Sequence, residues 1–148
     1  QLPVTARAMV ERYGRALIEQ FIDGLELTVG VLGRSALPPI QICTRRDFYN
    51  YDAKYNDNDT EYRFDIELPG TVLEQIKGLS LKAHGALGCR DFSRVDWMVD
   101  RVTHQPYALE VNTIPGFTDH SLLPKAARHA GLTFPQLCQR IVELALQR

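Results

Sequence analysis

Alternating polar and apolar residues predict two strands in the second half of the chain, at 94–99 and 107–112. The connection at 100–106 is short enough for an antiparallel hairpin, which would set the polar faces of the two strands side by side. The polar face is expected to carry Arg94, Asp96 and Met98 from the first strand, and Ala108, Glu110 and Asn112 from the second. The apolar face is expected to carry Val95, Trp97, Val99, Leu109 and Val111.

Apolar residues at helical spacing predict helices at 5–13 and 71–87, each followed by a glycine that can act as a C-cap, Gly14 and Gly88. In the tail, Thr133 is expected to cap a last helix with Pro135 in its first turn. The buried stripe of helix 71–87 is expected to contain Val72, Leu73, Ile76, Leu79, Ala83 and Leu87.

Strands are also expected at 16–22, 25–32, 38–43 and 63–68. The polar and aromatic segment 44–63 has little periodicity, and its aromatic residues favour an ordered lid over a disordered excursion. Hairpins between neighbouring strands, together with long helices, indicate an α+β fold with an antiparallel sheet backed by helices.

Composition narrows the class of protein. The chain has 148 residues, with 17 basic and 18 acidic side chains and a net charge of -1, so no bulk charge attracts nucleic acid or an anionic membrane. We find no apolar run long enough for a membrane span and no signal-peptide pattern. The scattered Cys43, Cys89 and Cys138 favour a reducing compartment, so we expect a cytoplasmic location.

Asp96, Glu110 and Asn112 would offer hard oxygen donors, which suit Mg²⁺. The alternative is a half-exposed hairpin whose polar face meets only water. The following Thr-Ile-Pro-Gly turn and a helix start at Asp119-His120-Ser121 favour a site that handles anions.

Three motifs carry a family resemblance, in chain order FYNYDAKY, SRVDWMVD and LEVNTIPGFTDHSLLPKAARHAG. Together with the final helix, and in this colinear order over nearly the whole chain, they resemble the C-terminal half of a D-alanine:D-alanine ligase of the ATP-grasp superfamily. The resemblance implies an ATP-grasp C-terminal domain over residues 1–148, as a fragment of a longer enzyme. The chain has no glycine-rich phosphate loop, and the family's upstream lysines and the domain that holds the first D-alanine are absent from it.

The resemblance implies an ATP-dependent synthesis of D-alanyl-D-alanine through an acyl-phosphate, for peptidoglycan precursors. ATP and two Mg²⁺ (or Mn²⁺) ions are the implied cofactors, D-alanine is the substrate, and the full-length enzyme is expected to be a homodimer.

The resemblance also implies a role for each matched residue. The metal ligands are Asp96, Glu110 and Asn112. Arg94 and the Gly116 backbone hold the tetrahedral intermediate's oxygen, and Tyr55 closes over the second substrate. Ser121 and Leu122 receive the second D-alanine carboxylate. The implied ATP-binding residues are Glu19, Gln20, Phe21, Ile22, Glu26, Phe48, Lys54 and Leu109.

Other interpretations stay open for several of these residues. Arg94 could form a salt bridge with a neighbouring carboxylate, Gly116 could be a turn glycine with positive φ, and Phe48 and Leu109 could be core residues. The chain could also belong to a D-alanine:D-lactate or another ATP-grasp ligase, against which Tyr55 speaks, or be an inactive binding or dimerisation module.

Overall fold

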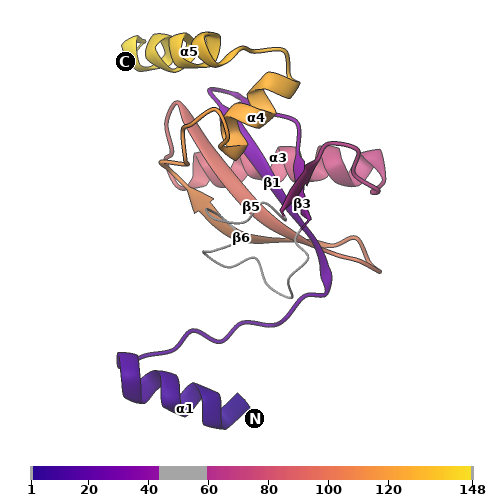
Figure 1. The fold of residues 1–148 in the computed structure, drawn as a ribbon, viewed down its shortest axis with the longest axis vertical. Coiled ribbons are helices and arrows are strands. Elements are labelled where there is room, and N and C mark those ends of the chain that lie inside the picture. The colour runs from indigo at the N-terminus through magenta and orange to yellow at the C-terminus, as the bar shows by residue number, and fades with distance from the viewer. Residues whose placement is uncertain (1, 44–59, 148) are drawn as a thin grey trace.

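The computed structural model describes residues 2–43 and 60–147, and its centre is an antiparallel sheet. Six strands are present in these residues, in the order β4-β3-β1-β5-β6, with β2 paired to β1. The strands are β1 (Gly24–Leu32), β2 (Ser35–Ala36), β3 (Ile40–Cys43), β4 (Glu61–Arg63), β5 (Phe92–Asp100) and β6 (Pro106–Asn112). The predicted α+β class and antiparallel sheet are confirmed (Figure 1).

The central pair of strands is β1 and β5, which align along their whole length from Gly24 opposite Asp100 to Leu32 opposite Phe92. This register places Thr28 directly opposite Asp96. Strand β6 then pairs with the other edge of β5, so the predicted hairpin is confirmed.

One face of the sheet is covered by α3 (Gly70–Ala86), which lies behind the strands in Figure 1. Its Ile76 packs against strand residues of that face, all of them buried, and the helix ends before Gly88, whose φ of 63° fits the expected C-cap. The strand residues in this cluster are Leu27, Val29, Val95, Trp97 and Val99. Leu87 is 66% exposed, so its expected place in the buried stripe was wrong, because the helix ends one residue earlier.

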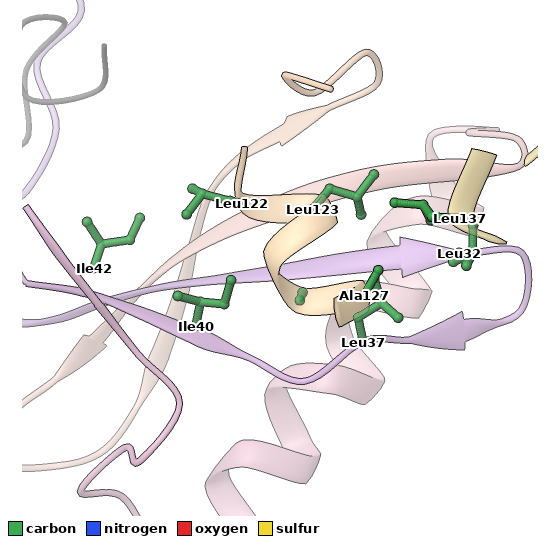
Figure 2. Packing of buried hydrophobic residues seen from close by; sticks show 9 residues of the cluster. Leu32, Leu37, Ile40, Ile42, Leu122, Leu123, Ala127 and Leu137 are labelled. Carbon is green, nitrogen blue, oxygen red and sulfur yellow. The ribbon is translucent and has the colours of Figure 1, made fainter. Parts of the chain in front are cut away.

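Among the described helices, α4 (Leu122–His129) and α5 (Phe134–Leu146) cover one end of the opposite face. Leu123 of α4 lies among residues of β1, its following loop and α5, as Figure 2 shows. The backbone of β1 approaches α4 so closely that a Cβ on Gly30 would lie 2.6 Å from the Leu123 side chain. The predicted cap of α5 is confirmed, because Thr133 and Gln136 form a capping box.

Helix α1 (Leu2–Tyr13) ends before Gly14 as predicted and lies away from the sheet, at the end of an extended segment (Figure 1). Its Met9, Val10 and Tyr13 are all exposed. Residues 15–23 follow without regular secondary structure, so the strand expected at 16–22 was wrong. This segment lacks a neighbouring strand with which to pair among the described residues.

Two further expectations about strands need correction. The strand predicted at 63–68 is instead β4, which ends at Arg63, and the following residues run irregularly toward α3. A β-bulge near Asp96 and Trp97 pairs Trp97 with Ala108, so Ala108 does not share the face of Glu110 as alternation had predicted. No helix within the described ranges is long and apolar enough to cross a membrane.

Candidate functional site

Asp96 lies at the centre of the polar face, where four hydrogen bonds reach its carboxylate. Arg94 donates from Nε to Oδ1 and from Nη2 to Oδ2, both at 2.8 Å. Thr28 Oγ1 donates to Oδ1 at 2.6 Å, and Asn112 Nδ2 donates to Oδ2 at 3.0 Å. Asp96 is only 4% exposed, so these bonds replace the water that a carboxylate would otherwise bind. A carboxylate offers about four acceptor positions, and the four bonds hold its orientation.

The charge state of Asp96 follows from these neighbours. Burial by itself raises the pKa of this carboxyl, but the hydrogen bonds and positive charge of Arg94, with help from the Thr28 hydroxyl, outweigh burial and lower the pKa. Asp96 is therefore ionised at neutral pH, which is the form that binds a cation. The ion pair with Arg94 is also the salt bridge that the sequence left open as an alternative.

Glu110 and Asn112 bring a second carboxylate and a carboxamide to the same place. Asn112 Nδ2 lies 3.0 Å from Asp96 Oδ2 and 3.2 Å from Glu110 Oε1, so two carboxylate oxygens converge on one atom. The predicted convergence of these three side chains is thus confirmed. Half a turn of the Asn112 carboxamide would present its oxygen to that place instead.

The donor set fits a divalent cation. Two carboxylates and an amide oxygen are hard ligands of the kind that Mg²⁺ and Mn²⁺ prefer. The part of the chain that the structure describes holds no cluster of three His, Cys, Asp or Glu side chains. The polar cluster itself contains two carboxylates, and its third oxygen donor is the carboxamide of Asn112.

Gly116 and Ser121 lie together after β6. A Cβ on Gly116 would stand 3.0 Å from Ser121 Oγ, and Gly116 does not have a positive φ, so the alternative of a left-handed turn glycine does not apply. Ser121 is the N-cap residue of α4, but its hydroxyl accepts from Thr118 N at 3.0 Å and hydrogen-bonds Thr118 Oγ1 at 2.9 Å. A side chain at position 116 would therefore fit only if the Ser121 hydroxyl moved by a few tenths of an ångström.

A cleft of about 990 Å³ opens over the same sheet face, at the end away from α4. It brings together the predicted ATP-binding residues that the structure describes, which are Glu19, Gln20, Phe21, Ile22, Glu26 and Leu109. Phe48, Lys54 and Tyr55 lie outside the described residues, so their roles stay predictions.

Other lining residues had not been predicted for the cleft, among them Ile42, Cys43, Met98, Arg101 and Tyr107. Met98 could have been found, because alternation already placed it on the face of Asp96. The residues of β3 could not, because the pairing of β3 with β1 is a tertiary contact.

Comparison with known proteins gives one consistent result. Residues 1–143 match the family model described as D-ala D-ala ligase C-terminus. A D-alanine--D-alanine ligase of Xanthomonas axonopodis pv. citri is 49% identical over 142 residues, which are 95% of this chain and 44% of that protein. The chain therefore spans less than half the length of this relative.

Two solved structures share the fold. The structure of D-alanine--D-alanine ligase from Bacillus anthracis complexed with ATP has a TM-score of 0.79 and 34% identity, over 99% of this chain and 46% of that one. The VanG D-Ala:D-Ser ligase from Enterococcus faecalis has a TM-score of 0.72 and 30% identity, over 85% of this chain and 37% of that one.

Proposed function

Because the chain belongs to the D-ala D-ala ligase C-terminus family, we propose that it is the C-terminal part of an enzyme that joins two D-alanines at the expense of ATP. The first D-alanine carboxylate takes the γ-phosphoryl group and ADP leaves. The amine of the second D-alanine then attacks the acyl carbon, loses a proton, and phosphate departs. The product serves peptidoglycan precursor synthesis.

The observation that carries this proposal is the polar cluster of Asp96, Glu110 and Asn112 beside Arg94. The first three side chains would hold two Mg²⁺ or Mn²⁺ ions, which neutralise phosphate charge during phosphoryl transfer. Arg94 carries a delocalised charge on this face, and with the Gly116 N–H it would hold the oxygen of the tetrahedral intermediate.

The remaining parts of the site follow from their positions. The cleft beside Glu26 and Leu109 would take the nucleotide, in keeping with the relative from Bacillus anthracis that was solved with ATP. Ser121 and Leu122 begin α4, where the first N–H groups of a helix favour a carboxylate. Ser121 and Leu122 lie close in sequence to Asn112, because only the turn around Gly116 separates the end of β6 from the start of α4.

The proposal also includes the location of the complete enzyme and its binding partners. We place the complete enzyme in the cytoplasm as a homodimer, with no nucleic-acid or membrane partner. All three cysteines are free, which supports a reducing compartment.

The test is phosphate release by the complete enzyme with ATP, Mg²⁺ and single amino acids. We expect turnover with D-alanine and little with L-alanine, and mass spectrometry should identify the dipeptide. The Glu110→Gln enzyme is the control for contaminating activity. Equal rates with both enantiomers, or no dependence on D-alanine, would refute the proposal and leave the binding-module alternative.

The purified 148-residue chain should fold but make no dipeptide, because it lacks the phosphate loop and the first-alanine site. Synthesis by this chain above the rate of its Glu110→Gln variant would show that it contains a complete site.

A second candidate differs only in the acceptor. The similarity to a D-Ala:D-Ser ligase shows that this fold also serves another second substrate. Rates with D-alanine, D-serine and D-lactate as acceptors would decide between them. Tyr55→His should change this preference more than the affinity for ATP, because the family resemblance assigns Tyr55 to the second substrate and hence to acceptor discrimination.

A further inference from the structure

Thr28 is a buried polar residue of the sheet for which the proposed function has no direct use. It lies on β1, is 2% exposed, and is paired in register with Asp96 on the neighbouring strand. Its hydroxyl donates to Asp96 Oδ1 at 2.6 Å, the shortest of the bonds that reach this carboxylate. The only other acceptor near it in the described contacts, Val95 O, is at 3.5 Å and contributes little.

The hydrogen-bond donors to Asp96 differ in whether they would also bind a substrate or a cation. If the proposed function holds, Arg94 turns to a substrate oxygen and the Asn112 carboxamide turns its oxygen to a cation. Both partners would then leave or weaken their bonds to Asp96. Of the described hydrogen-bond donors to Asp96, Thr28 is the one that would bind neither substrate nor cation and would keep its bond to Asp96.

The position of Thr28 suits a permanent bond. It approaches Asp96 from the β1 side, whereas Glu110 and Asn112 approach from the β6 side of β5. The hydroxyl therefore takes one acceptor position on Oδ1 and leaves the side toward β6 open. Threonine is β-branched and stiff about χ1, so a buried threonine holds its hydroxyl in one direction.

We infer that Thr28 is a positioning residue, which rests on the proposed function: its hydroxyl fixes the Asp96 carboxylate so that it meets the metal ions in the correct orientation. Hydrogen-bonding partners of metal ligands commonly change metal affinity 10–100-fold when they are removed. Thr28 should therefore affect metal binding although it touches no metal itself.

The experiment uses two pairs of variants that differ by one hydroxyl group. Thr28 and Thr28→Val are nearly isosteric, as are Thr28→Ser and Thr28→Ala. Mn²⁺ binding to the complete enzyme, with a non-hydrolysable ATP analogue present, is measured by electron paramagnetic resonance. We expect Mn²⁺ to bind about 10-fold or more weakly to Thr28→Val than to the wild type, with the same direction between the Ser and Ala variants.

A matched control separates positioning from a general loss of packing. Ser80 is also fully buried and its hydroxyl accepts a hydrogen bond from Trp97 Nε1 at 2.9 Å, on the opposite face of the sheet. Ser80→Ala should lower the unfolding temperature measured in EDTA but leave Mn²⁺ affinity unchanged. Thr28→Val should do the reverse, with its main effect on Mn²⁺ affinity.

Each outcome decides one question. Mn²⁺ affinities that are equal within each pair would overturn the role of Thr28 and leave the proposed function intact. Equal losses in Thr28→Val and Ser80→Ala would show a structural effect only, which also overturns it. A wild-type enzyme that fails to bind Mn²⁺ with the nucleotide analogue would overturn the proposed metal site itself. If Thr28→Val does not fold, the Ser and Ala pair decides alone.

Discussion

The two faces of the β1–β5 pair differ in chemistry although alternate residues of the same two strands form them. On the face toward α3, Val95 and Trp97 are buried in a continuous apolar cluster. On the other face, Asp96 is as deeply buried as Trp97, at 4% exposure each, but it is surrounded by hydrogen-bond donors. Burial therefore does not distinguish the core from the site here, whereas the partners of each side chain do.

The faces also differ in how they are covered. Helix α3 runs behind the strands, whereas α4 reaches only the end of the other face near Gly30. The cleft with Glu26 and Leu109 lies at the other end of this face. The face that packs against α3 therefore supports the polar face on the same strands, and regular strands hold Asp96 and its partners in place.

The largest expected effect comes from substitutions on the polar face of the sheet, at Asp96 and Glu110. Asp96→Asn and Glu110→Gln should each lower the turnover of the complete enzyme by at least about 100-fold, because even an indirect partner of a metal ligand can matter that much. The unfolding temperature should change little in Glu110→Gln, whose side chain is exposed. Turnover near wild type at saturating Mg²⁺ in both variants would remove these residues from the metal site.

The next prediction concerns the apolar face of the sheet, which packs against α3. Ile76→Ala should lower the free energy of unfolding of the 148-residue chain by about 2–5 kcal/mol, because Ile76 is fully buried against β1 and β5. Val142→Ala is the control, since Val142 is 57% exposed on α5 and should change stability by less than about 0.5 kcal/mol. Urea denaturation followed by circular dichroism measures both, and similar losses would contradict the assignment of the core.

A smaller effect should come from a polar contact within the core face. Ser80→Ala removes the acceptor of Trp97 Nε1, which leaves a buried N–H without its partner and costs about 1–3 kcal/mol. The same urea titration measures the loss. A variant as stable as wild type would mean that the indole finds another acceptor.

The smallest effect concerns pH. His84 is 8% exposed on α3, its Nδ1 lies 2.7 Å from Ser93 Oγ, and burial lowers its pKa below the ordinary 6.5. The unfolded chain then binds this proton more readily than the folded one. The stability from neutral His84 is present above pH 6.5 and is lost as pH falls toward the folded-state pKa, by at most about 1.4 kcal/mol per pH unit.

His84→Gln should remove this part of the pH dependence while its amide can still bond Ser93. Thermal unfolding between about pH 7.5 and about pH 5, an interval that includes the ordinary histidine pKa of 6.5, measures it. An unchanged slope in the variant would show that other groups cause the pH dependence.

The sequence by itself determined the elements that depend on local pattern. Period-two alternation fixes which residues of a strand share a face, so the hairpin of β5 and β6 and the meeting of Asp96, Glu110 and Asn112 could be predicted. The cap of α5 at Thr133 and the end of α3 before Gly88 follow from equally local rules. Apolar content alone misled at 16–22, where no strand forms because the segment has no pairing partner among the described residues.

Only the tertiary structure decided what lies beside the hairpin. Pairing between distant strands set Thr28 against Asp96 and brought Ile42 to the cleft, and no local pattern encodes such a register. The bulge that separates Ala108 from the face of Glu110 depends on how β6 pairs with β5. The tight space beside Gly116 likewise arises from the approach of Ser121, which only the folded chain brings this close.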